Sequence, residues 1–274
     1  ISYSVTGVQT CALPILGNFG AKGVKKLLTS TVAVVGAGGL GCPALQVLAG
    51  AGVGHLKIID HDAVALSNLP RQILHSTNDL DKPKVKSAKE RLLAMNPEID
   101  IEIVSDFLCT SNIAAFLTGT DYVIEASDNL ATKFLVNDAC VHFGVPFTIA
   151  GVLGYGGQVL SVQPGRSACY RCLFSSPLNT SQLENCSTAG ILATTSIIGG
   201  SIQANEAIKT LLGLEGRLLN TLLTFDLSSY KFIPVKISQN SQCETCKDPS
   251  HAFYKTARYT LDAPQCGQKL EKEE

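Results

Sequence analysis

Short apolar runs alternate with longer amphipathic stretches along the first half of the chain. The apolar runs are rich in β-branched residues and predict strands at 31–35, 55–59, 99–104, 122–126 and 146–150. The stretches between them space apolar and small residues at a helical interval, which predicts helices at 40–51, 84–95 and 130–143. Because strands that alternate with helices imply crossover connections, we expect an α/β fold with a mostly parallel sheet and helices on both faces.

The pattern changes after Gly151. Segment 151–165 alternates and contains repeated glycines, and 222–227 and 230–237 form a second pair of alternating runs. We therefore expect antiparallel strands that extend the sheet, with one helix between them at 199–212. The polar segment 248–274 is expected to be a flexible tail.

Composition narrows the class of protein. The chain is 45% hydrophobic and 16% charged with a formal net charge of −1, which excludes a disordered chain and leaves no basic surface for nucleic acid. The longest apolar candidate for a membrane helix, 189–204, is interrupted by threonines and serines and falls short of the roughly 18 residues needed. We therefore expect a cytoplasmic protein with neither nucleic acid nor membrane as a partner.

A glycine-rich turn follows the first predicted strand. Residues 36–41 read Gly-Ala-Gly-Gly-Leu-Gly, which matches G-x-G-x-x-G before a predicted helix. Such glycines let phosphate approach backbone N–H groups at the helix N-terminus. Asp60 ends the next predicted strand, where a carboxylate can bind ribose hydroxyls. The pattern indicates a Rossmann-like nucleotide-binding fold, but it does not separate ATP from NAD.

Two basic residues are candidates for phosphate contacts. Arg71 lies in the loop 67–72, Ser-Asn-Leu-Pro-Arg-Gln, and a guanidinium group suits phosphate oxygens. Lys84 begins a predicted helix, where a positive charge is unfavourable, which indicates an anionic ligand. The neighbouring Lys82 and Lys86 weaken this second indication.

Asp128 is a candidate ligand for Mg²⁺. It follows the predicted strand 122–126 in the sequence Ser127-Asp128-Asn129, so its carboxylate is expected at the carboxyl edge of the sheet. The alternative is that Asp128 only caps the helix that begins near Leu130.

Four of the ten cysteines form two Cys-x-x-Cys pairs. They are Cys169, Cys172, Cys243 and Cys246. Four thiolates are the number that a closed tetrahedral zinc site requires, so we expect a structural zinc that joins two distant hairpins. A single pair could instead be redox-active.

Taken in order, the glycine turn, Asp60, the loop 67–72, Lys84, Ser127-Asp128-Asn129 and the paired Cys-x-x-Cys motifs resemble the MoeB/ThiF/HesA family, bacterial relatives of ubiquitin-activating enzymes. The similarity covers about 16–247. It implies an ATP-dependent adenylyltransferase whose partner is a small ubiquitin-like sulfur carrier of the MoaD or ThiS type, ending in Gly-Gly. The carrier's C-terminal carboxylate attacks the α-phosphate of ATP, giving an acyl-adenylate and pyrophosphate for molybdopterin or thiamine (thiazole) biosynthesis.

The same resemblance implies the residues that contact ATP. They are Gly38, Gly39, Gly41, Asp60, Asn68, Arg71, Lys84 and Asp128. Asp60 would bind the ribose, and Asp128 would hold Mg²⁺. Asn68, Arg71 and Lys84 would neutralise the polyphosphate and the charge that develops at the α-phosphorus. Positioning and electrostatics suffice for this reaction, so no protein nucleophile is required.

The remaining cysteines are less informative. Cys186 falls where many family members carry a cysteine in a mobile loop, so it either forms a covalent link to the carrier or to sulfur, or is a spare loop cysteine. The nearby Glu184 argues against a lowered thiol pKa. Cys42, Cys109 and Cys140 lie in apolar segments and are expected to be buried.

Residues 1–15 differ in character from the rest. They resemble a translated sequencing adaptor, and they lack the basic and long apolar regions of a signal peptide, so we expect them to be non-native. Family members carry an arginine that reaches the ATP of a partner subunit, which implies a homodimer. By family spacing this arginine would fall at about Cys11 or Ala12. We therefore expect weak or absent adenylation by the chain as given.

Two other functions stay open at this point. An NAD-dependent oxidoreductase would explain the glycine turn and Asp60, but it leaves Arg71, Lys84 and Asp128 without a shared task. A catalytically inactive scaffold that binds carrier proteins is the third possibility.

Overall fold

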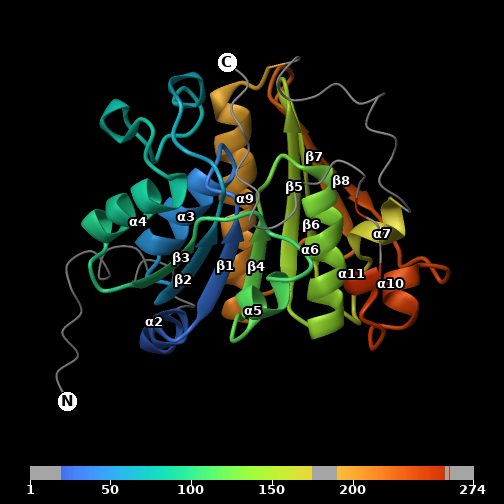
Figure 1. Cartoon of the computed structure of the whole chain (residues 1–274). Coiled ribbons are helices and arrows are strands. Elements are labelled where there is room, and N and C mark those ends of the chain that lie inside the picture. The colour runs from blue at the N-terminus through green and yellow to red at the C-terminus, as the bar shows by residue number, and fades with distance from the viewer. Residues whose placement is uncertain (1–19, 175–189, 257–258, 260–274) are drawn as a thin grey trace.

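One mixed sheet of eight strands runs through the protein in the order β3-β2-β1-β4-β5-β6-β7-β8 (Figure 1). The computed structural model describes residues 20–174, 190–256 and 259. The strands are β1 Thr31–Val35, β2 His55–Ile59, β3 Asp100–Val104, β4 Tyr122–Glu125, β5 Phe147–Leu153, β6 Gly156–Val162, β7 Thr221–Asp226 and β8 Lys231–Lys236. Neighbouring strands from β3 to β5 are parallel, and those from β5 to β8 are antiparallel.

Helices cover both faces of this sheet (Figure 1). The α-helices are α2 Gly20–Leu28, α3 Gly41–Gly50, α4 Lys84–Met95, α5 Ile113–Leu117, α6 Leu130–Phe143, α7 Tyr170–Leu173, α9 Ala193–Leu211, α10 Glu244–Lys247 and α11 Phe253–Thr256. Two 3-10 turns, Leu66–Asn68 and Thr77–Asp79, lie between β2 and α4. One apolar core packs under α3, α4 and α9, and a second packs under α5, α6 and the C-terminal helices.

The architecture confirms the expected α/β class, with a parallel half that is extended by antiparallel strands. Between β1 and β4 the order of the strands reverses, since β2 and β3 lie on one side of β1 and the later strands on the other. In open α/β sheets such a switch point opens a crevice outside the carboxyl ends of the strands.

The helix α9 begins earlier than the sequence pattern predicts, at Ala193. Small residues let α9 approach α3 closely. A Cβ atom at Gly200 would lie 2.1 Å from the carbonyl oxygen of Leu40 and 2.7 Å from Cγ of Pro43. The backbone of Leu40, which is part of the glycine turn, therefore packs against α9.

Gly200→Ala should destabilise the protein by about 1–3 kcal/mol, because the added methyl group overlaps backbone atoms that cannot move away independently. Urea unfolding of the variant and the parent measures this loss. Gly50→Ala is the matched control, since a Cβ atom there meets nothing within 4 Å. Alanine is the better helix former, so the control should be neutral or slightly stabilising. Equal stability of Gly200→Ala and the parent would contradict the close packing of α3 and α9.

Part of the segment expected to be a flexible tail packs against the domain. Residues 248–256 and Tyr259 are described, and Tyr254 is buried against the aromatic rings of His142 and Phe143 on α6. The rest of this segment, 257–258 and 260–274, lies outside the described residues. Among the helices that the structure describes, none combines the length and the apolar character needed to cross a membrane.

Candidate functional site

A cavity of about 590 Å³ opens at the carboxyl edge of the sheet, at the switch point between β1 and β4. Segments that follow β1, β2, β3 and β4 line it. The predicted site residues that line it are Gly38, Gly39, Asp60, Arg71, Lys84 and Asp128. Asn68 and Gly41 are not among the lining residues. The fold thus brings together six polar or glycine positions that are far apart in the sequence.

The glycine turn is shaped by close backbone contacts. Gly36 has a φ of 96°, and a Cβ atom there would lie 2.9 Å from the carbonyl oxygen of Ala126. A Cβ atom at Gly41 would lie 1.9 Å from the carbonyl oxygen of Gly36. Gly41 is therefore needed to join the turn to α3, whereas Gly38 and Gly39 present their backbone to the cavity.

Asp60 holds the glycine turn in place. Its Oδ2 accepts a hydrogen bond of 2.7 Å from the backbone N–H of Ala37, and its Oδ1 accepts one of 2.8 Å from the backbone N–H of Asp62. Each carboxylate oxygen has two lone pairs, so both can accept a further hydrogen bond from the cavity. Asp60 can therefore fix the turn and bind a hydroxyl group at the same time.

Lys84 is buried and paired with an acidic residue that the sequence did not single out. Its Nζ donates a 2.7 Å hydrogen bond to Oδ2 of Asp62. The hydrogen bond from His61, 3.1 Å away, and then the charge of Lys84 hold the pKa of Asp62 well below its usual value, against the opposing effect of burial. The ring of His61 also stacks on Phe107, with ring centroids 3.5 Å apart. Lys84 is thus aimed at the cavity and has an anionic partner there.

Asn68 contacts Arg71 instead of lining the cavity. Nη2 of Arg71 donates a 3.0 Å hydrogen bond to Oδ1 of Asn68. Nη1 of Arg71 donates a longer one, 3.4 Å, to the carbonyl oxygen of Ser67. The loop 67–72 therefore orients its own guanidinium group, and Arg71 is the member that reaches the cavity.

Asp128 is exposed, and no described residue donates a hydrogen bond to its carboxylate. The N-cap of α6 is Asn129, whose Oδ1 accepts a 3.1 Å hydrogen bond from the backbone N–H of Thr132. The alternative that Asp128 only caps this helix is therefore wrong. Its carboxylate instead lines the cavity.

Sequence reasoning missed Lys133, which lines the cavity from the first turn of α6. Its side chain lies beneath the loop that carries Asp128 and pairs with the fully buried Glu125. Neither residue belongs to a motif, and only their shared burial identifies them.

His75 is a second buried residue that the sequence analysis missed. Its Nε2 lies 3.0 Å from the carbonyl oxygen of Ala37, and its Nδ1 lies 2.8 Å from Oγ of Ser87. A carbonyl oxygen can only accept, so Nε2 carries the proton and Nδ1 accepts from the serine when the ring is neutral. The neutral ring thereby ties the glycine turn to α4.

The stability of the protein should fall as the pH drops below about 6.5, in part because of His75. Burial, and to a lesser extent the charge of Lys84, lowers the pKa of His75 in the folded protein. Below the unfolded pKa the unfolded chain binds a proton that the folded chain does not, so the free energy of unfolding decreases with falling pH.

Urea unfolding of the parent and of His75→Gln between about pH 7 and pH 5 tests this contribution. The parent's free energy of unfolding should exceed that of His75→Gln at about pH 7, and this difference should shrink as the pH falls. His251→Gln, a change on the surface, should follow the parent. A constant difference between the parent and His75→Gln over this range would contradict the role of the buried neutral ring.

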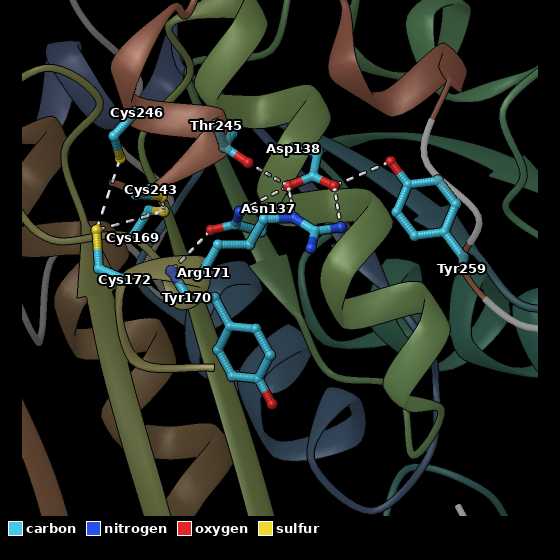
Figure 2. Close-up of polar contacts among 10 residues, drawn as sticks. All are labelled: Asn137, Asp138, Cys169, Tyr170, Arg171, Cys172, Cys243, Thr245, Cys246 and Tyr259. Carbon is cyan, nitrogen blue, oxygen red and sulfur yellow. Dashed lines mark hydrogen bonds and ion pairs between the residues drawn. The ribbon is translucent and has the colours of Figure 1, made fainter. Parts of the chain in front are cut away.

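The four Cys-x-x-Cys cysteines lie beside α6, the helix that carries Asn137 and Asp138 (Figure 2), and Cys169 and Cys243 share an apolar core with that helix. Sγ of Cys169 lies 3.9 Å from Sγ of Cys172 and 3.6 Å from Sγ of Cys243, and Cys172 and Cys246 are 3.8 Å apart. All four sulfur atoms lie within 4.8 Å of one another. A zinc ion with Zn–S bonds of about 2.3 Å requires sulfur atoms about 3.8 Å apart in a tetrahedron. The cluster therefore has the dimensions of a tetrahedral zinc site.

Each Cys-x-x-Cys turn also sends a side chain to Asp138 on α6 (Figure 2). Arg171 binds both carboxylate oxygens, from Nε at 2.7 Å and from Nη2 at 2.8 Å. Oγ1 of Thr245 donates to the same carboxylate at 2.9 Å, and the hydroxyl of Tyr259 donates to it at 3.0 Å. The cysteine cluster is thus attached to the helix whose N-terminus borders the cavity.

The other cysteines give a mixed result. Cys42 and Cys140 are buried, as expected, whereas Cys109 is only half-buried on the loop before α5. Cys186 and residues 1–19, including Cys11 and Ala12, lie outside the described residues.

Comparisons with known sequences identify similar proteins over most of the chain. A sequence model described as the ThiF family matches residues 12–245. A protein of Thermus thermophilus named "Sulfur carrier protein adenylyltransferase" is 38% identical over 239 residues, which are 85% of this chain and 88% of that protein.

Longer relatives are also similar. The protein named "Adenylyltransferase and sulfurtransferase MOCS3" of Culex quinquefasciatus is 40% identical over 235 residues, which are 85% of this chain and 54% of the relative. Its namesake in Drosophila grimshawi is 42% identical over 236 residues, 85% of this chain and 53% of the relative. The chain spans about half the length of these relatives.

A solved structure supports the fold. The crystal structure of E. coli MccB with ATP superimposes with a TM-score of 0.73 at 23% identity, over 82% of this chain and 69% of that chain. At this level of identity the similarity concerns the fold alone.

Proposed function

Because the chain belongs to the ThiF family, we propose that it is an ATP-dependent adenylyltransferase acting on the C-terminal glycine carboxylate of a ubiquitin-like sulfur carrier. The observation that carries the proposal is the cavity at the switch point, which the glycine turn, Arg71, Lys84 and Asp128 line together, with no described residue donating a hydrogen bond to the carboxylate of Asp128. The name of the Thermus thermophilus relative, which this chain matches over most of its length, supports the choice of carrier.

The proposed reaction forms one bond and breaks one bond. An oxygen of the carrier carboxylate attacks the α-phosphorus of ATP, and the bond from that phosphorus to the bridging oxygen of pyrophosphate breaks. Arg71 would bind the phosphate oxygens through its guanidinium group. Lys84 would exchange Asp62 for the phosphates, which needs only a small movement because both groups line the same cavity. Charges that the fold holds in place in this way would stabilise the charge that develops at the α-phosphorus.

Mg²⁺ fits Asp128. The carboxylate offers hard oxygen ligands, is exposed to the cavity and has no described partner that a cation would have to displace. Mg²⁺ supplies charge neutralisation at the phosphates when it is bound. Asp128 is the residue that would hold it.

Zn²⁺ fits the cysteine cluster. Four thiolates at tetrahedral separations leave no open coordination position, which suits a structural ion. Cys169, Cys172, Cys243 and Cys246 would hold it and so keep the two Cys-x-x-Cys turns together.

The test is carrier-dependent exchange of labelled pyrophosphate into ATP. Purified chain is incubated with a MoaD-like or a ThiS-like carrier, each ending in Gly-Gly, and a carrier that lacks the final glycine serves as control. We expect exchange only with an intact carrier. Because residues 1–15 are expected to lack a family arginine, the rate is measured at high enzyme concentration, and ATP binding is titrated in parallel.

The two alternative functions predict different results in the same set of assays. Reduction of NAD with a substrate, without pyrophosphate exchange, would support an oxidoreductase. Binding of the carrier, with neither pyrophosphate exchange nor ATP binding, would support a catalytically inactive scaffold. The identity of the more active carrier distinguishes the molybdopterin pathway from the thiazole pathway. Sedimentation of the chain tests the proposed homodimer.

A further inference from the structure

Lys133 uses every donor that its ammonium group has. Nζ donates hydrogen bonds to Oε2 of Glu125 at 2.5 Å, to the carbonyl oxygen of Ser127 at 2.7 Å and to the carbonyl oxygen of Ala150 at 2.7 Å. An ammonium group has three N–H donors, so all are occupied. The residue is 7% exposed. It joins the end of β4, the loop that follows and the neighbouring strand β5.

Glu125 completes the contacts to this loop. Its Oε1 accepts a 2.9 Å hydrogen bond from the backbone N–H of Ser127 and another from the hydroxyl of the same residue. Its backbone carbonyl accepts a 2.7 Å hydrogen bond from Nε2 of Gln203 on α9. The buried pair Glu125–Lys133 therefore holds Ser127 through its N–H, its hydroxyl and its carbonyl group.

Asp128 lies between two immobilised residues. Ser127 is held by the pair Glu125–Lys133, and Asn129 is held as the N-cap of α6. The carboxylate of Asp128 is thus presented to the cavity from a fixed backbone. Mg²⁺ demands near-ideal ligand geometry, so a ligand that is already oriented binds it more tightly.

Packing alone does not require a charge at this position. Burial of an ion pair costs several kcal/mol in desolvation, and apolar residues of similar volume often replace such a pair without loss of stability. The pair Glu125–Lys133 nevertheless lies directly beneath the loop that carries Asp128. The pair forms hydrogen bonds with the N–H, the hydroxyl and the carbonyl group of Ser127. An apolar pair could not fix the position of Ser127 in this way.

On this basis we propose that Lys133 is a positioning residue, which orients Asp128 for Mg²⁺–ATP by fixing the carbonyl group of Ser127. The inference rests on the proposed function for the identity of the nucleotide. It assigns a role to a residue outside the motifs, and it requires no contact between Lys133 and the substrate.

Calorimetric titration of ATP, with and without Mg²⁺, tests this role without turnover. The test variant is the double substitution Glu125→Gln/Lys133→Met, because it leaves no unpaired charge and is therefore expected to fold. Its Mg²⁺-dependent gain in ATP affinity should fall by roughly 10-fold or more, the usual effect of removing groups that orient a metal ligand. The affinity for ATP without Mg²⁺ should not change. The single variant Lys133→Arg, which keeps a positive charge beside Glu125, should retain part of the Mg²⁺-dependent gain.

Lys89→Met is the matched control. Lys89 also donates a 2.7 Å hydrogen bond to a backbone carbonyl, that of Ile101, but it lies outside the cavity. It should keep the parent's full gain with Mg²⁺. Thermal unfolding of each variant confirms that the chain is folded.

The outcomes separate this inference from the proposed function. A folded double variant with the parent's Mg²⁺-dependent gain would overturn the role of Lys133, and so would a parent that shows no gain. Reduction of NAD by the parent in place of carrier-dependent exchange, together with a Mg²⁺-dependent gain that the double variant loses, would overturn the proposed reaction and support the role of Lys133.

Discussion

Asp128→Ala should abolish carrier-dependent pyrophosphate exchange while leaving the metal content of the cysteine cluster unchanged. The carboxylate is exposed to the cavity, caps no helix and has no described hydrogen-bond partner, so its removal disturbs little of the fold. The loss of a metal that stabilises phosphate charge is worth several kcal/mol, or roughly a 100-fold or greater reduction in rate. The Mg²⁺-dependent gain in ATP affinity should disappear as well.

Glu98→Ala is the control for this experiment. Glu98 is also an exposed acidic residue, in the turn before β3, and it is not among the residues that line the cavity. It should exchange pyrophosphate like the parent. Exchange by Asp128→Ala at the rate of the parent would refute the assignment of the metal to Asp128.

Cys246→Ser should lose the metal and unfold at a markedly lower temperature. Cys246, in the second Cys-x-x-Cys turn, is half-buried, and its sulfur lies 3.8 Å from that of Cys172 in the first. Serine is a poor zinc ligand, so the free energy of metal binding, of the order of 10 kcal/mol in zinc-dependent domains, is no longer available to the folded state. A loss of several kcal/mol lowers Tm by about 10 °C in a domain of this size.

Two measurements make this expectation specific to the metal. Elemental analysis should find one zinc per chain in the parent and in Cys140→Ala, which removes a buried thiol outside the cluster. A chelator should lower the Tm of the parent to that of Cys246→Ser and should leave the variant unchanged. A parent that contains no metal after expression with zinc, or a Cys246→Ser variant with the parent's Tm, would contradict a structural zinc site.

The attachment of the cluster to α6 explains why its effect should extend beyond the two Cys-x-x-Cys turns. Arg171 and Thr245, one from each turn, bind Asp138 in the middle of α6 (Figure 2). The N-terminal end of the same helix carries Lys133 and follows Asp128. Loss of the metal should therefore weaken nucleotide binding as well as stability.

Several features were predictable from the sequence because they depend on neighbouring residues. The alternation of apolar runs and helical stretches reflects which backbone conformations the local residues favour, and it predicted the strands, the helices α3, α4 and α6, and most of α9. It did not predict the shorter helices α2, α5, α7, α10 and α11. The glycine spacing at 36–41 reflects a tight turn, and the structure shows the backbone approaches that require it. The paired Cys-x-x-Cys motifs indicated four ligands for one ion, and their sulfur atoms do converge.

Other features depended on contacts between residues that are distant in the chain. Lys84 meets Asp62, and Tyr259 reaches Asp138, through packing that no local pattern encodes. The sequence left open whether Asp128 caps α6, because Asp128 and Asn129 are both good caps; the backbone geometry selected Asn129.

The Rossmann-like class, the glycine turn and the cysteine ligands were therefore determined by the sequence itself, since near neighbours in the chain set the backbone conformations on which they rest. The tertiary structure decided which polar groups line the cavity and which instead form the buried hydrogen bonds that hold its loops in place. Lys133 shows the difference most clearly. Its importance comes from the burial of its ammonium group among three acceptors, which exist only after β4, β5 and α6 have packed together.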